Sequence, residues 1–197
     1  MEQKLFGMWD TTIAVADLGL KPYINLNPVI VPKSAGRHRQ RFHRAMYTNI
    51  VERLINKLKV TGHKGKKHRV SSGHNTSKSI YLYNLVIKTF KIIEQETKKN
   101  PVEVFIRAIE NAAPREEITS IEYGGAKYPQ AVETAPERRV DMALRQMTQG
   151  AYSKSFNSKK GIVHCLADEI IKAYNNDQTS QAIAKKLELE RQASSSR

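Results

Sequence analysis

The clearest chemistry in the sequence belongs to a block of cationic side chains at residues 33–69. This block holds twelve Lys and Arg residues against one acid, Glu52, and so carries +11 of the net charge of +14 at pH 7. A solvated face normally alternates charge signs, because like charges at helical spacing repel one another. A single-sign block instead favours a polyanion whose phosphates it neutralises. The alternative is a solvated basic face without a ligand.

A second cationic group lies nearer the C-terminus, where Arg138 and Arg139 begin a predicted helix and Arg145 lies on the same face as Arg138. Guanidinium groups suit bidentate phosphate binding. The alternative is ion pairing on the helix surface with one of three nearby carboxylates: Glu133, Glu137 and Asp141.

Lys127 and Tyr128 follow a predicted turn and offer a cation and a stacking ring to an unpaired base. The alternative for Tyr128 is packing of its ring against the helical domain.

Other reactive residues do not form a recognisable catalytic or metal-binding pattern. His63, His68 and His74 share a polar loop, but no cysteine or carboxylate stands at ligand spacing beside them. Cys165 lies on the inward side of a predicted helix, where a small buried thiol is ordinary. No phosphate-binding glycine loop of the Walker type is present. We therefore expect no enzymatic activity, no metal and no cofactor.

Length and composition indicate a basic globular protein. The chain has 197 residues, of which 40% are hydrophobic, and its single cysteine excludes an intrachain disulfide. It has no apolar run of about 18 residues that could span a membrane, and its N-terminus lacks the apolar core of a secretion signal. We expect a cytoplasmic protein with no membrane partner.

The spacing of apolar residues predicts a mainly α fold: a single helical domain of about six helices at residues 46–197. The helices are expected at about 48–62, 79–96, 100–114, 136–150, 158–174 and 180–192. The last helix has only Ile183 and Leu187 as firm apolar anchors, so weak docking is expected. Alternation around Gly124 and Gly125 predicts a projecting two-stranded hairpin at about 118–132.

Residues 1–45 are predicted to form an extended N-terminal arm that is basic from Lys33. Pro22, Pro28 and Pro32 interrupt its short apolar pieces and oppose a continuous helix. Trp9 is expected to anchor the arm in a groove of the domain surface.

The combination of several motifs in this chain matches the sequence pattern of one protein family. They include Asn-Pro-Val-Glu at 100–103 and Gly-Gly-x-x-Tyr at 124–128. The further matching stretches are residues 45–46, 49–58, 104–111, 114–116, 131–132, 136–139 and 167–171. The chain resembles the small ribosomal subunit protein seven family. Its archaeal and eukaryotic branch is indicated by Leu5, Phe6, Gly7, Trp9 and residues 23–26, 34–38, 189–191 and 195–197.

The resemblance implies a primary binder of small-subunit ribosomal RNA that organises the head of the subunit near the tRNA exit site and the messenger path. Its partners would be that RNA, other small-subunit proteins, and exit-site tRNA and messenger RNA nearby. Lys127 and Tyr128 match the ribbon that faces the tRNA region, and Arg138 and Arg139 match an arginine pair that touches ribosomal RNA. The loop 61–77 and residues 133–134, after the ribbon, depart from the family pattern.

We therefore predict a structural constituent of the cytoplasmic ribosome. One alternative is a helical DNA-binding regulator, which would need a recognition helix and a dimerisation surface. Another is a metal-dependent nuclease, which would need clustered carboxylates. The predicted RNA-binding residues are Lys33, Arg37, Arg39, Arg41, Arg44, Arg53, Lys57, Lys64, Lys66, Lys67, Arg69, Arg115, Lys127, Tyr128, Arg138, Arg139 and Arg145.

Overall fold

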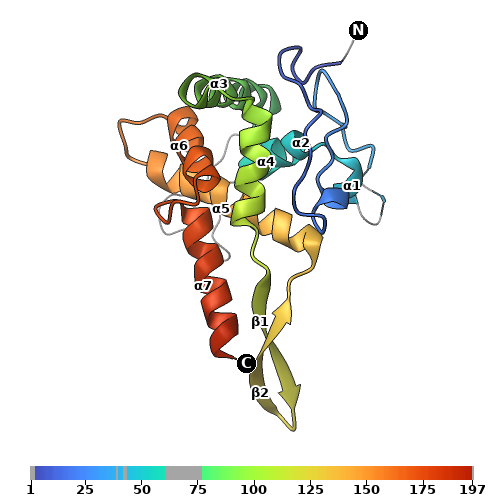
Figure 1. The fold of residues 1–197 in the computed structure, drawn as a ribbon, viewed down its shortest axis with the longest axis vertical. Helices are drawn as coiled ribbons and strands as arrows, with labels where there is room; N and C mark the ends of the chain where they lie inside the picture. The colour runs from blue at the N-terminus through green and yellow to red at the C-terminus, as the bar shows by residue number, and fades with distance from the viewer. Residues whose placement is uncertain (1–2, 39, 42–43, 61–76, 197) are drawn as a thin grey trace.

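The computed structural model describes residues 3–38, 40–41, 44–60 and 77–196 (Figure 1). Within these residues the chain is mainly α, as predicted, with seven α-helices, a 3-10 turn at Lys21–Tyr23 and one antiparallel hairpin. In chain order the elements are α1 (Arg44–Tyr47), α2 (Ile50–Leu58), α3 (Ser79–Thr97), α4 (Pro101–Ala112), β1 (Glu116–Tyr123), β2 (Ala126–Glu133), α5 (Pro136–Ser155), α6 (Ile162–Tyr174) and α7 (Gln181–Ser195). The helix beyond the predicted six is α1, whose single turn is too short to show periodicity.

Two helices begin at the caps that the sequence indicated. The Asn49 side chain accepts a hydrogen bond from the Val51 amide at the start of α2, and Asn100 accepts one from Val102 at the start of α4. Each bond satisfies an amide that has no partner inside its helix. Pro101 occupies the first turn of α4, where its missing N–H costs nothing.

The boundary between α5 and α6 differs from the prediction. Helix α5 does not end at Gly150 but continues to Ser155, and α6 begins at Ile162 rather than near residue 158. Gly150 is a packing residue: a Cβ there would lie 3.0 Å from Cβ of Gln181 and 3.1 Å from the carboxylate of Glu169. The glycine that looked like a helix stop thus lets three helices approach one another.

The core lies where α3, α4, α5 and α6 meet. Phe90, Phe105, Leu144 and Leu166, one from each helix, are fully buried, and the Phe90 and Phe105 rings lie 5.8 Å apart. Cys165 is buried beside them as expected. Burial raises the pKa of its thiol, which keeps the sulfur protonated and unreactive.

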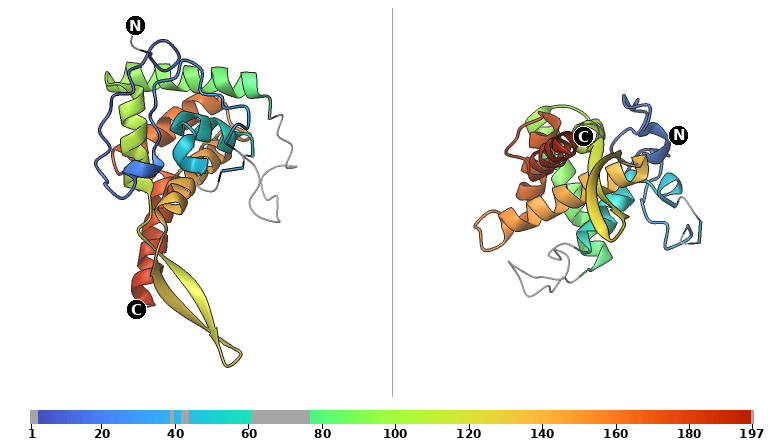
Figure 2. Two further views of the ribbon diagram at one scale, coloured as in Figure 1. Left: turned by 90° about the vertical axis from the view of Figure 1, so that its right-hand side faces the viewer. Right: turned by 90° about the horizontal axis from the view of Figure 1, so that it is seen from below.

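The N-terminal segment before Val31 packs along this helical body (Figure 2). Leu5, Trp9 and Leu20 are buried, and the Trp9 indole N–H donates to the Glu94 carboxylate at 3.0 Å. The Trp9 ring also meets Phe90 edge-on at 5.6 Å. Trp9 is therefore part of the core and not a side chain resting in a surface groove.

The hairpin projects away from the helices as a twisted ribbon (Figures 1 and 2). Its register pairs Glu116 with Glu133 and Ser120 with Pro129. Gly124 and Gly125 both have positive φ, the conformation that a tight two-residue turn between twisted strands requires. The ribbon is slightly longer than the predicted 118–132.

Helix α7 lies alongside β1, so the ribbon base does not stand alone (Figure 1). Ala182, Ile183 and Ala193 are its buried residues, whereas Leu187 is 43% exposed. The prediction of Leu187 as an anchor was wrong. Polar contacts add to the docking: the Glu190 carboxylate accepts the Arg115 amide at 3.0 Å, and Lys186 donates to the Asn111 carbonyl at 2.8 Å.

Candidate nucleic-acid interface

The structure separates the predicted binding residues that it describes into two regions. One surrounds α2 and contains Lys33, Arg37, Arg41, Arg53 and Lys57. The other surrounds the ribbon and the first half of α5 and contains Arg115, Lys127, Tyr128, Arg138, Arg139 and Arg145. Arg44 begins α1. Arg39, Lys64, Lys66, Lys67, Arg69 and the histidine loop lie outside the described residues.

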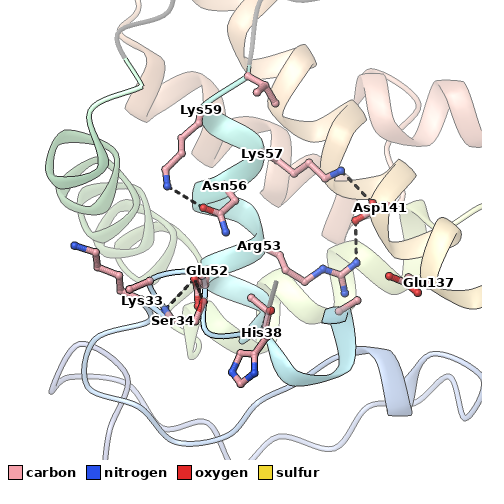
Figure 3. A pocket seen from close by; sticks show the side chains of 15 residues that line it. Lys33, Ser34, His38, Glu52, Arg53, Asn56, Lys57, Lys59, Glu137 and Asp141 are labelled. Atoms are coloured by element: carbon pink, nitrogen blue, oxygen red, sulfur yellow. Dashed lines mark hydrogen bonds and ion pairs between the residues drawn. The ribbon is translucent and has the colours of Figure 1, made fainter. Parts of the chain in front are cut away.

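An open basin of about 620 Å³ connects α2 to α5 and to residues 33–38 (Figure 3). Four cationic side chains line it, together with three carboxylates: Lys33, Arg53, Lys57 and Lys59 against Glu52, Glu137 and Asp141. The basin is therefore a mixed-charge surface.

Asp141 holds two of the predicted binding residues in place. Its two carboxylate oxygens accept hydrogen bonds from Arg53 at 2.9 Å and from Lys57 at 3.1 Å. Burial would raise the pKa of Asp141, but the hydrogen bond from Arg53 and the charges of both cations outweigh it and lower the pKa. Arg53 also donates to the Tyr23 carbonyl at 2.8 Å, and only 8% of its side chain is exposed. The Arg53 guanidinium is thus engaged inside the protein.

The two adjacent arginines of α5 have different environments. Arg139 is nearly buried, donating to the Asp17 carboxylate at 2.9 Å and to the Pro114 carbonyl at 3.1 Å. The charge and hydrogen bond of Arg139 outweigh the effect of burial and lower the pKa of Asp17. Arg138 is 57% exposed and forms a forked pair with Glu117 of β1, with N–O distances of 2.7 and 2.8 Å.

Ion pairing was the alternative considered for these arginines, but the carboxylates involved are not those considered. The sequence pointed to Glu133, Glu137 and Asp141 because they are close along the chain. The observed partners, Asp17 and Glu117, become neighbours only through the fold.

Six of the predicted cations are exposed and, within the described part of the chain, form no ion pair with a carboxylate. They are Lys33, Arg37, Arg41, Arg115, Lys127 and Arg145. On the ribbon, Tyr128 is 58% exposed. These side chains can meet an external ligand without breaking an internal ion pair.

The sequence did not single out Tyr47, which organises part of the basic arm. The Arg41 guanidinium lies 4.4 Å from the centre of the Tyr47 ring, and the His38 ring stacks on the same tyrosine at 5.9 Å. Such stacking holds the cation over an aromatic face. Its only sequence signal is a tyrosine soon after a run of arginines and histidines.

Over the described ranges, no three His, Cys, Asp or Glu side chains come together in a way that could hold a metal ion. Within the same ranges, no helix is both long and apolar enough to cross a membrane.

The fold and the site together define a class: a basic, mainly helical protein with a projecting ribbon and outward-facing cations near one helix and the ribbon base. The family model for ribosomal protein S7p/S5e matches residues 20–197, and the chain belongs to this family.

Its curated relatives include archaeal proteins called small ribosomal subunit protein uS7. The relative from Nanoarchaeum equitans is 52% identical over the full length of both chains. That from Archaeoglobus fulgidus is 46% identical over all of this chain and 96% of its own, and that from Methanococcoides burtonii is 44% identical over 98% and 99%. The predicted family and its archaeal branch are confirmed.

Proposed function

We propose that this protein is a non-enzymatic, structural constituent of the cytoplasmic small ribosomal subunit and that it binds small-subunit ribosomal RNA. Its membership of the S7p/S5e family and the names of its archaeal relatives support the ribosomal role. The observation that carries RNA binding is the set of exposed cations without internal carboxylate partners, including Arg37 and Arg41 near α2 and Arg145 on α5.

The mechanism is charge neutralisation across two separated surfaces. Cations near α2 and cations near the ribbon base would contact phosphates of different RNA helices, which lowers their repulsion and allows a junction to close. Because A-form RNA hides its major groove, recognition would rest on backbone geometry and unpaired bases. Lys127 and Tyr128 would supply a cation and a stacking ring on the ribbon.

The predicted binding residues then divide by role. Arg53 and Arg139 position the binding surface through their internal bonds, and Lys57 shares the Asp141 carboxylate with Arg53. The exposed cations, Lys33 among them, contact phosphate, together with Arg44 and the cations outside the described residues: Arg39, Lys64, Lys66, Lys67 and Arg69. We propose that the bound RNA belongs to the head of the subunit. Exit-site tRNA and messenger RNA would lie near the ribbon, and other small-subunit proteins would be neighbours.

Filter binding of the full-length protein to a head-domain RNA junction tests this function. About 6–10 phosphate contacts predict a fall of roughly 10³–10⁵ in the binding constant between 50 and 200 mM salt. Duplex DNA and random duplex RNA of equal length are the matched competitors. Equal affinity for either competitor, or binding that is insensitive to salt, would contradict the proposal, and tight DNA binding would favour a DNA-binding regulator.

The contribution of the arm is best tested without truncation, because Leu5, Trp9 and Leu20 are core residues. Replacing Arg37, Arg39, Arg41 and Arg44 by alanine leaves these core residues in place and should remove a distinct set of protections in RNA footprinting. Protections near the ribbon should remain. An unchanged footprint would exclude the arm from the interface.

A further inference from the structure

A second groove adjoins the basin along α2, between α2, the start of α3 and residues 31–33, and Lys33, Glu52, Asn56 and Lys59 border both. It has a volume of about 370 Å³, and its floor is formed by Val31, Pro32, Ile55, Ile80 and Tyr83. These side chains are mainly aliphatic, in contrast to the polar wall of the basin.

Among the described residues, nothing covers the apolar surface of this groove. Val31 is 55% exposed and Ile80 is 77% exposed, and the adjacent Ile30 is 56% exposed. Single exposed apolar residues are common, but a group that lines one concave site marks a binding surface. Ribose and phosphate offer nothing apolar to cover these branched side chains.

Two lysines border this apolar floor. Lys33 and Lys59 lie on the side of α2 that faces α3, whereas Arg53 and Lys57 face α5 (Figure 3). Lys59 donates to the Asn56 side chain at 2.9 Å, and neither ammonium group has a carboxylate within 4 Å in the described ranges. Glu52, which also borders the groove, already accepts the Ser34 amide and hydroxyl at 2.9 and 2.7 Å.

We propose that this groove binds a short segment of a neighbouring protein, in which a branched aliphatic side chain stands next to Asp or Glu. The aliphatic side chain would cover Ile80 and Val31, and the carboxylate would pair with Lys59. A nucleobase is a poorer occupant, because bases stack on aromatic or guanidinium planes and the one ring in the floor, Tyr83, meets Phe6 edge-on at 4.9 Å.

The test uses the full-length protein and a fluorescein-labelled peptide, Glu-Asp-Leu-Leu-Asp-Glu, followed by fluorescence anisotropy at 150 mM salt. Because the protein is strongly basic, any acidic peptide could bind without specificity, so a second peptide has serine in place of both leucines. Loss of the apolar contact should weaken binding about tenfold or more.

The variants Ile80→Asp and Lys59→Glu should each lower the affinity for the leucine peptide at least fivefold. Ile80 is exposed, so its replacement leaves the core intact. The matched control is Lys91→Glu, which reverses one charge further along α3 and should leave binding within twofold. Circular dichroism melting verifies that every variant is folded.

Equal affinity for the leucine and serine peptides would overturn the proposal, because binding would then be electrostatic only. Failure of the leucine peptide to bind would also overturn it. The groove would instead be an RNA site if a single-stranded oligoadenylate bound more tightly than the peptide and if Ile80→Asp weakened that binding. None of these results affects salt-dependent binding of the RNA junction, which tests the proposed function separately.

Discussion

The role of each cation depends on which acceptor it meets. Arg53 and Arg139 satisfy their guanidinium groups inside the protein, on a carboxylate and a backbone carbonyl each. Arg37 and Arg145 have comparable chemistry but no carboxylate within reach among the described residues. The first pair therefore contributes to the fold, and the second pair is available to a ligand.

Asp141→Asn should destabilise the protein by about 1–2 kcal/mol. The substitution leaves the buried Arg53 guanidinium with a neutral acceptor, and partial exposure of Asp141 reduces the cost of losing a charge-assisted bond. Urea unfolding at pH 7 measures the change. Asp168→Asn, which breaks an exposed pair with Lys160, is the control and should cost less than about 0.5 kcal/mol. Equal losses in both variants would contradict a special role for Asp141.

The same carboxylate predicts a pH dependence. The pKa of Asp141 is lower in the folded than in the unfolded protein. The stability that its ionised carboxylate contributes is therefore fully present above the unfolded pKa of about 3.9. The contribution is lost as the pH falls from there through the folded pKa. In Asp141→Asn, stability should therefore decline less steeply than in the wild type below about pH 4.

Glu117→Gln should increase RNA affinity a few-fold. The Glu117 carboxylate occupies the guanidinium edge of Arg138 that a phosphate would use, so RNA must displace it. The effect on stability should stay below about 1 kcal/mol, because the Arg138 end of the pair is 57% exposed. Filter binding at 150 mM salt measures the gain.

Glu122→Gln is the matched control for Glu117→Gln. It removes the same charge from the same strand, and no hydrogen bond joins Glu122 to Arg138. An equal gain in both variants would show that only net charge had changed.

At the level of elements, local signals determined what could be predicted. Caps such as Asn49 and Asn100 and the apolar periodicity of α3 and α4 depend on neighbouring residues, so these helices were found. The length of α5 was missed because Gly150 is a packing residue and not a helix stop. The side chains it packs against belong to α6 and α7, which reach Gly150 only in the folded protein. The binding-site cations were visible as a charge block, but their internal partners, such as Asp17, were not.

Gly150→Ala should destabilise the protein by about 1–3 kcal/mol, although alanine at an exposed position in a helix normally stabilises it by up to about 1 kcal/mol. The added methyl would meet Gln181 and the Glu169 carboxylate. Glu169 cannot shift freely, because it is fully buried and accepts bonds from Lys154 at 2.6 Å and Ser180 at 2.8 Å.

Thermal unfolding measures the effect of Gly150→Ala, and Gln146→Ala on the same helix is the control, expected to lie within about 0.5 kcal/mol of the wild type. Hydrogen exchange in α7 should increase in Gly150→Ala, because the clash pushes α7 away from α5. A stabilised variant would show that the three helices have room to adjust.

At the scale of the whole molecule, long-range contacts connect the N-terminal segment to three helices. Trp9 bonds to Glu94 of α3, the amides of Ala16 and Asp17 donate to Glu110 of α4, and Asp17 pairs with Arg139 of α5. The basic residues from Lys33 onward follow directly. One continuous segment thus begins as part of the core and ends as part of the binding surface.

The two halves of this segment should therefore respond differently to mutation. Trp9→Ala should cost about 3–5 kcal/mol, because it removes a buried ring packed on Phe90 and its hydrogen bond. Arg37→Ala combined with Arg41→Ala should leave unfolding within about 0.5 kcal/mol per site and lower the salt slope of RNA binding by about 1.4–1.8. Thermal unfolding and filter binding on each variant separate the effects. Comparable loss of stability in both would mean that the arginines also belong to the fold, whereas an unchanged salt slope would place them away from the RNA phosphates.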